Sequence, residues 1–318
     1  MTILALGFLA ICNQTDHSVF IANLDTKQVV HRIPVERGPH EAAVSPSGKL
    51  VAISNYGDQA AGNKITLIKL PEGTILKVID TGDYKRPHGL AWKSETELFS
   101  TSEAKNALVL WDTTTGTAKR TFDTGQRGSH MLAYVGNRLY SANVFDSTVS
   151  AFDLDSGAKI GQVTVGKGSE GIGISPDGKQ VWTGNRADHT LSVIDTANLK
   201  VIDTLECKGM PYRVCFTPDG KRVLVPCPES GEVAVFDAKS RKLIKRIDLS
   251  AGSEKFETPA PKPAPVGVTV HPNGKFAYAS VMLGKAVAVI DLKAMKVIGQ
   301  IEAGIQPDGL AVSPIKAN

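Results

Sequence analysis

Residues 168–209, GSEGIGISPDGKQVWTGNRADHTLSVIDTANLKVIDTLECKG, contain four short runs rich in apolar and β-branched residues. The runs are Glu170–Ser175, Gln180–Gly184, Thr190–Asp195 and Lys200–Leu205. Pro176-Asp177-Gly178 lies between the first two and has the chemistry of a tight turn, with φ preset at proline and a left-handed position at glycine. Short runs bounded by such turns are typical of strands, and no extended helical period interrupts them. The segment therefore predicts a four-stranded antiparallel unit.

The same unit recurs along the chain with a period of roughly 42 residues, which is the spacing of β-propeller blades. Each repeat opens on one of the tripeptides Gly38-Pro39-His40, Arg86-Pro87-His88, Gly128-Ser129-His130, Gly168-Ser169-Glu170, Met210-Pro211-Tyr212, Ala264-Pro265-Val266 and Gln306-Pro307-Asp308. The last repeat matches only a first strand, whereas the N-terminal residues match a second, third and fourth. We therefore predict an all-β, seven-bladed β-propeller with four antiparallel strands per blade. Its last blade is closed by strands from both termini.

These repeats predict one domain over residues 1–318. Blades 1 to 6 span about 38–84, 85–126, 127–167, 168–209, 210–263 and 264–305, and blade 7 combines 306–318 with 1–37. The net charge is only +4, and no basic run is interleaved with aromatic residues, so we expect no nucleic-acid partner. The oligomeric state stays open.

Three segments of the fourth repeat resemble the YVTN-type β-propeller repeat of surface-layer and periplasmic proteins. They are Ser175-Pro176-Asp177-Gly178-Lys179, Val181-Trp182-Thr183-Gly184-Asn185 and Leu191-Ser192-Val193-Ile194-Asp195-Thr196. The resemblance covers essentially the whole chain. Propellers of this kind include lactonase-like enzymes, lyases, redox enzymes and scaffolds, so it implies the fold and leaves the chemistry open.

The resemblance also implies a periplasmic or secreted protein, although the compartment stays open. Thr2–Cys12 is apolar but has no basic start and no small-residue cleavage site. We therefore expect a buried strand there, not a signal peptide or a membrane span.

One matched position, which we call the inner slot, opens the first strand of every repeat. Its residues are His40, His88, His130, Glu170, Tyr212, Val266 and Asp308. First strands line the channel of a propeller, so side chains from successive blades can converge at its mouth. Three imidazoles and a carboxylate suit zinc, manganese or iron, and we predict a divalent metal site at His40, His88, His130 and Glu170. The alternative is that each histidine only bonds backbone and water in a wet channel.

Loop lengths indicate which face of the disc carries function. Insertions at Tyr56–Asn63 and Ser250–Pro263 lengthen the face on which the first strands begin, whereas the opposite face has regular turns. Irregular loops favour the first of these faces as the functional one. The proline-rich Ser250–Pro263 segment predicts a stiff flap over the channel, with a variable surface loop as the alternative.

Further polar residues are predicted around the same mouth. The ends of the second strands place Asn13, Asn55, Glu103, Asn143, Asn185 and Cys227 on this face. We predict a substrate-binding set in which the guanidiniums match a substrate carboxylate, formed by Arg186, Arg213, Tyr56, Asn143 and Asn185. Two alternatives stay open, because asparagines also cap strand ends and arginines also pair with acidic neighbours such as Glu170 or Asp308.

Taken together, these residues predict a metal-dependent enzyme of the ester or lactone hydrolase type, or a lyase. The substrate is a small carbonyl- or carboxylate-bearing molecule, and the predicted proton carrier is Glu170, Tyr212 or Asp308. No Gly-x-Ser-x-Gly elbow, Walker loop or dinucleotide fingerprint is present. A non-catalytic scaffold or partner-binding propeller, and a redox protein with histidine as an axial ligand, are the alternatives.

The four cysteines have no metal-ligand spacing. Cys215 and Cys227 fall on consecutive strands of one predicted hairpin and could approach each other, but we expect buried thiols.

Overall fold

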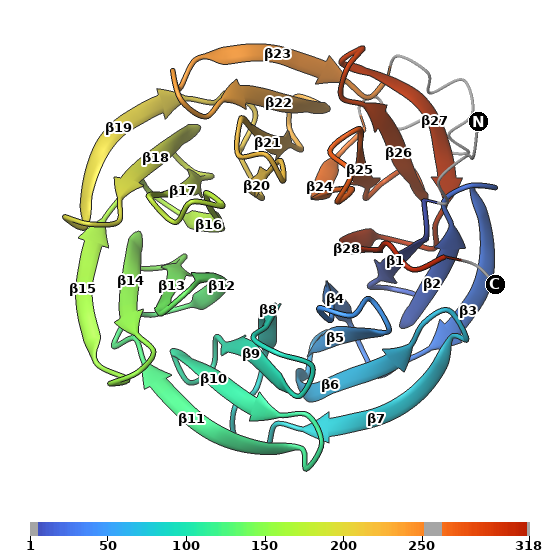
Figure 1. Ribbon diagram of the computed structural model, residues 1–318, viewed down its shortest axis with the longest axis horizontal. Coiled ribbons are helices and arrows are strands. Elements are labelled where there is room, and N and C mark those ends of the chain that lie inside the picture. Colours follow the sequence, from blue (N-terminus) through green and yellow to red (C-terminus); the bar gives the residue numbers. More distant parts are fainter. Residues whose placement is uncertain (1–5, 251–262, 317–318) are drawn as a thin grey trace.

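The computed structural model describes residues 6–250 and 263–316, and within them 28 strands form seven four-stranded antiparallel sheets. Figure 1 shows these sheets as blades arranged around a central axis. The predicted seven-bladed β-propeller is thereby confirmed. None of the described residues belongs to a helix long and apolar enough to cross a membrane.

The strands of each blade occupy four positions from the channel to the rim. In the order of blades 1 to 7, the inner strands are β4 (Pro39–Val44), β8 (Pro87–Trp92), β12 (Ser129–Val135), β16 (Ser169–Ile174), β20 (Cys215–Phe216), β24 (Pro265–Val270) and β28 (Pro307–Ser313). The second strands are β5 (Leu50–Gly57), β9 (Glu97–Ser102), β13 (Arg138–Asn143), β17 (Gln180–Asn185), β21 (Arg222–Cys227), β25 (Phe276–Val281) and β1 (Phe8–Asn13). The third strands are β6 (Ala61–Lys69), β10 (Ala107–Asp112), β14 (Thr148–Asp153), β18 (Thr190–Asp195), β22 (Glu232–Asp237), β26 (Ala286–Asp291) and β2 (Ser18–Asn23). The outer strands are β7 (Thr74–Asp80), β11 (Thr117–Asp123), β15 (Lys159–Thr164), β19 (Lys200–Glu206), β23 (Leu243–Asp248), β27 (Lys296–Glu302) and β3 (Gln28–Pro34).

Blade 7 is assembled from the two ends of the chain, as predicted. β28 pairs antiparallel with β1, and Leu9 lies opposite Val312 in that register. Figure 1 shows the C-terminal strand β28 at the channel beside the N-terminal β1. The second strand of blade 7 is therefore paired on both sides, with β2 and with β28.

The core lies between neighbouring blades. Successive side chains of a strand point to opposite faces, so β1 sends Leu9 and Ile11 toward blade 6 and Phe8 and Ala10 toward blade 1. All six residues of β1 are buried for this reason. Each second strand is thus held on both faces, which makes it a firm base for the loop that follows it.

The inner slot coincides with an irregularity of the inner strands. In six blades the register between the inner and second strands shifts at the slot, for example between Pro39 and Ala42 in β4. A β-bulge re-aims side chains, and here it turns the slot residues toward the channel. Blade 5 differs, because β20 is only two residues long.

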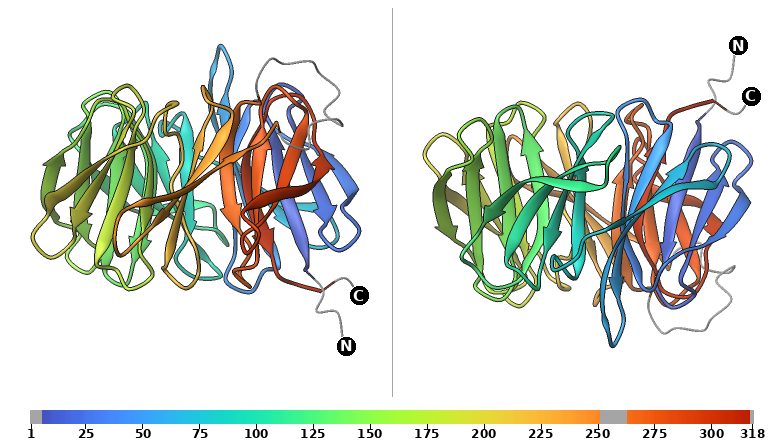
Figure 2. Two further views of the ribbon diagram at one scale, coloured as in Figure 1. Left: turned by 90° about the horizontal axis from the view of Figure 1, so that it is seen from above. Right: turned by 90° about the horizontal axis from the view of Figure 1, so that it is seen from below.

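The mouth face carries the longest described hairpin. β5 and β6 extend to Gly57 and Ala61, and Figure 2 shows this light-blue hairpin projecting from one face of the disc. The predicted flap at Ser250–Pro263 lies almost entirely outside the described residues.

Candidate active site at the channel mouth

Three histidine rings from successive blades stack at the mouth. The ring centroids of His40 and His88 are 4.1 Å apart, and those of His88 and His130 are 3.7 Å apart. The ring of Tyr56, from β5, approaches His88 edge-on at 5.4 Å. The predicted convergence of the three imidazoles is thus present in the structure.

His88, in the middle of the stack, is fully buried. Neither of its ring nitrogens has a hydrogen-bond partner among the described residues. Burial lowers the pKa of His88 well below its ordinary value, and the neighbouring His130 and His40 act in the same direction. The ring is therefore neutral. One of its two nitrogens carries no hydrogen, and the lone pair of that nitrogen accepts no hydrogen bond from the described residues.

His130 lies between two carboxylates. Its Nδ1 contacts Oε1 of Glu103, and its Nε2 lies 2.6 Å from Oε1 of Glu170. Burial opposes a charge on this ring, but Glu170 and Glu103 outweigh it and raise the pKa of His130 to about 9. His40 behaves in the opposite way, because burial and the nearby Arg213 lower its pKa to about 4.

Arg213 is the central cation of the site. Its guanidinium binds Glu41, from the far side of the channel, through Nε at 2.9 Å and through Nη2. It also lies 3.4 Å from Oε1 of Glu170 and 3.7 Å from Oδ1 of Asp308. One buried guanidinium therefore links inner-strand residues of blades 1, 4 and 7.

The acidic groups divide into two kinds. Burial opposes the ionisation of Glu170, but His130, Arg213 and Arg186 lower its pKa to about 2, which favours the ionised form at neutral pH. Burial raises the pKa of Asp308 to about 6, against the effect of Arg213. Burial likewise raises the pKa of Tyr212, which keeps its phenol neutral. Asp308 is the better proton carrier among the three predicted ones.

Side chains at or just beyond the ends of the second strands contact and orient the acidic side chains of the site. Oη of Tyr56 donates to Glu103 at 2.7 Å, and Nε2 of Gln14 donates to Asp308 at 2.7 Å. Nη1 of Arg186 lies 2.8 Å from Oε2 of Glu170. The Arg186 side chain is 35% exposed, so it lies at the rim where a ligand from solvent can reach it.

Two groups of three residues have metal-ligand spacing within the described part of the chain. They are His40, Glu41 and His88, and His88, Glu103 and His130, each with ligand atoms within 4.8 Å of one another. His88 belongs to both groups. Glu170 belongs to neither, and its oxygens are in contact with His130, Arg186 and Arg213.

The predicted ring of strand-end residues needs one correction. Register pairs Pro39 with Asn55 and Pro87 with Ser102, so Ser102 is the equivalent of the asparagines and Glu103 lies one position further on. That next position also holds Gln14, Tyr56 and Arg186, which all face the mouth.

Asn143 and Asn185, predicted to bind substrate, are fully buried. The Asn143 amide donates to Thr148 and Ser150 within its own blade. Asn185 makes the equivalent bonds in the next blade, so both amides cap strand ends.

Sequence analysis missed Glu41, which directly follows the inner slot, and Gln14. Shifting the alignment of the repeats by one residue would have found both. Alignment alone does not reveal that a bulge brings two consecutive residues to the channel.

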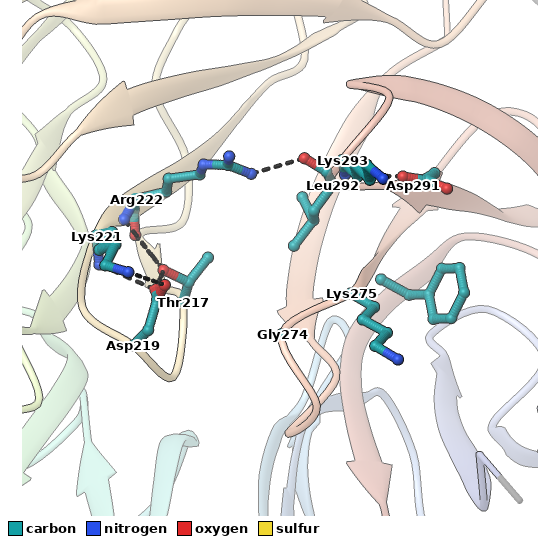
Figure 3. Close-up of a pocket in the computed structure, with 10 residues that line it drawn as sticks. Thr217, Asp219, Lys221, Arg222, Gly274, Lys275, Asp291, Leu292 and Lys293 are labelled. Carbon is teal, nitrogen blue, oxygen red and sulfur yellow. Dashed lines mark hydrogen bonds and ion pairs between the residues drawn. The ribbon is translucent and has the colours of Figure 1, made fainter. Parts of the chain in front are cut away.

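A cleft on the other face has none of this chemistry. It lies between blades 5 and 6, has a volume of about 620 Å³, and is lined by residues that include Asp219, Lys221, Arg222, Lys275 and Asp291 (Figure 3). Both of its carboxylates accept backbone hydrogen bonds in their own turns. The channel mouth is therefore the candidate active site.

Known proteins share this fold. A family described as "Lactonase, 7-bladed beta-propeller" matches residues 36–261. Antigen Lp49 of Leptospira interrogans is 23% identical over 276 residues, which cover 78% of this chain and 58% of Lp49. The chain thus spans little more than half the length of that relative.

Two solved structures are similar in shape and distant in sequence. Kuenenia stuttgartiensis hydrazine synthase superimposes with a TM-score of 0.73 and 17% identity, over 87% of this chain and 90% of that one. Dihydro-heme d1 dehydrogenase NirN, in complex with DHE, gives a TM-score of 0.70 and 16% identity, over 97% and 76%. At this identity both likenesses establish the fold alone.

Proposed function

The chain belongs to the seven-bladed β-propeller lactonase family, and from this premise we propose that it is a metal-dependent hydrolase of small, carboxylate-bearing lactones or esters. The observation that carries the proposal is the state of His88. Its ring is buried, and neither ring nitrogen has a hydrogen-bond partner among the described residues. His88 also belongs to both groups of residues that have metal-ligand spacing. Buried polar atoms are nearly always bonded, so such an imidazole suggests a ligand. We also infer a YVTN-type repeat and a periplasmic or secreted location.

The charge balance of the site supports a divalent cation. Four carboxylates, from Glu41, Glu103, Glu170 and Asp308, stand against the guanidiniums of Arg186 and Arg213. With neutral imidazoles the cluster has two excess negative charges, which are costly to bury. A proton on His130 offsets one of them, whereas a divalent cation offsets both.

The proposed ligands are the three histidines with Glu103. Glu103 is preferred to Glu170 because it belongs to a group of metal-ligand spacing with His88 and His130. Nitrogen and carboxylate ligands suit zinc, manganese or iron. When bound, such a cation polarises a carbonyl and makes water more acidic.

The protein's own groups supply the remaining steps. Arg186, at the rim, binds the carboxylate of the substrate. Asp308 accepts a proton from the attacking water as the bond to the carbonyl carbon forms. The neutral phenol of Tyr212 donates a proton to the leaving ring oxygen as the ester bond breaks, so that the product is a hydroxy acid. A lyase would use the same metal and Asp308 to remove a proton beside a carbonyl.

A second candidate, a ligand-binding propeller without catalysis, is favoured by one observation. The guanidinium of Arg213 pairs with three carboxylates of the protein itself, as expected of a cation with a purely structural role.

The test is metal content and lactone hydrolysis of the His88→Ala variant beside His31→Ala, a matched control on outer strand β3. We expect about one equivalent of metal in the wild-type protein and in the control after incubation with zinc, manganese and iron, and loss of metal and turnover in His88→Ala. Equal metal content in all three proteins would refute the metal site. Metal binding without turnover of any lactone, ester or carbonyl acid would favour the binding protein.

A further inference from the structure

Cys207 and Cys227 lie side by side in a core cluster that also includes Val214, the residue after Arg213. Their sulfur atoms are 3.7 Å apart, and both residues are fully buried. Cys215, which follows Cys207 in the chain and lies on the same hairpin as Cys227, pairs with Leu224 and not with Cys227. From this juxtaposition we propose that Cys207 and Cys227 form a disulfide that ties the exit of blade 4 to the second strand of blade 5.

The two cysteines occupy matched positions that no other blade fills with sulfur. Cys207 is the first residue after an outer strand, where the other blades have Val35, Thr81, Thr124, Val165, Leu249 and Ala303. Cys227 lies at the strand end occupied elsewhere by Asn13, Asn55, Ser102, Asn143, Asn185 and Val281. In blades 3 and 4 the asparagine amide there binds the third strand. Only in blade 5 do two thiols meet at this junction.

Blade 5 is also where a covalent link has most to stabilise. Its inner strand β20 has two residues, whereas the other inner strands have six or seven. Pro226 of β21 accepts from the N–H of Tyr212 but has no N–H of its own to return. Residues 207–214, which carry Tyr212 and Arg213, therefore lack most of the ladder that holds the equivalent residues elsewhere.

The chemistry is thiol–disulfide exchange with a small-molecule disulfide. A hydrogen bond joins the two thiols, and the thiol that accepts it has the lower pKa. Either sulfur can be the donor, so the exchange can begin at either cysteine, for example at Cys227. Its thiolate attacks the oxidant and releases one thiol. Cys207 then attacks the mixed disulfide and releases the second. Two electrons pass from the cysteine pair to the oxidant, and both cysteine protons leave with the released thiols.

Because both thiols are fully buried, the exchange takes place while the chain folds or when residues 207–214 open. Cys12 and Cys215 are internal controls. Cys12 packs between blades 7 and 1, and Cys215 packs between blades 5 and 6, so neither shares a core cluster with the pair.

The experiment refolds the full chain with oxidised glutathione, then denatures and alkylates it before peptide mass spectrometry. We expect alkylated Cys12 and Cys215 and a Cys207–Cys227 cross-linked peptide. The oxidised wild type and the Cys215→Ser variant should unfold about 5 °C above their reduced forms, whereas Cys227→Ser should show no such shift. Alkylation of all four cysteines, or a cross-link involving Cys12 or Cys215, would overturn the proposal. Neither outcome depends on the metal or on lactone hydrolysis.

Discussion

At the scale of single residues, Arg213 shows how the site is held together. It is 5% exposed and lies among Glu41, Glu170 and Asp308. Removing one partner of a buried ion network leaves charges that neither water nor protein compensates. The stability of the inner ring and the geometry of its acids thus depend on one guanidinium.

We therefore expect Arg213→Met to lower the free energy of unfolding by about 3–5 kcal/mol. Urea denaturation measures this, with Arg32→Met as the control. Arg32 pairs with Glu302 on the rim, where its side chain is 53% exposed, and such a pair contributes less than about 1 kcal/mol. Equal losses in the two variants would show that Arg213 makes no special contribution.

At the scale of elements, four blades have a glycine directly after the slot, and each of these glycines packs against backbone of the next blade: Gly89, Gly171, Gly267 and Gly309. A Cβ on Gly171 of β16 would lie 2.3 Å from the carbonyl oxygen of Tyr212 and 2.6 Å from the Cα of Arg213. Both contacts are with backbone, so no side chain can move aside. The close approach therefore fixes where Arg213 lies relative to Glu170.

Gly171→Ala should separate β16 from residues 211–214, cost about 1–3 kcal/mol of stability, and strongly reduce turnover. Gly274→Ala is the contrast, because Gly274 has φ +68° and open space around its Cβ position. That variant should lose stability through backbone strain and keep its turnover per folded molecule. Unchanged activity in Gly171→Ala would mean that the position of Arg213 is not critical.

The same elements explain what the sequence could predict. Turn chemistry and strand alternation, as in Pro176-Asp177-Gly178, are local, so the blades and their closure followed from the repeat. The inner slot followed too, because its three histidines open consecutive repeats at the same matched position. Glu41 and the neighbourhood of Cys207 did not, because no other repeat has an acid directly after the slot or a cysteine after its outer strand.

At the scale of the whole molecule, the ring is closed only through blade 7. Phe8 pairs with Ser313, at opposite ends of the chain, and the same β28 brings Asp308 to the channel. The clusters on either side of β1 pack against blades 6 and 1, and both include residues of β28. The strand β28 therefore has two roles: it closes the ring by pairing with β1, and it places Asp308 in the candidate site.

Ending the chain after Ile305 should therefore abolish the single cooperative unfolding transition, because β1 loses its inner neighbour and two core clusters lose Leu310, Ala311 and Val312. Differential scanning calorimetry measures this. A synthetic peptide of residues 306–318 added to the truncated chain should restore the transition, since the peptide supplies the missing strand. A truncated chain that still melts in one transition at the wild-type temperature would show that six complete blades hold the ring without closure. In that case β28 would serve the site through Asp308 and would not be needed for the fold.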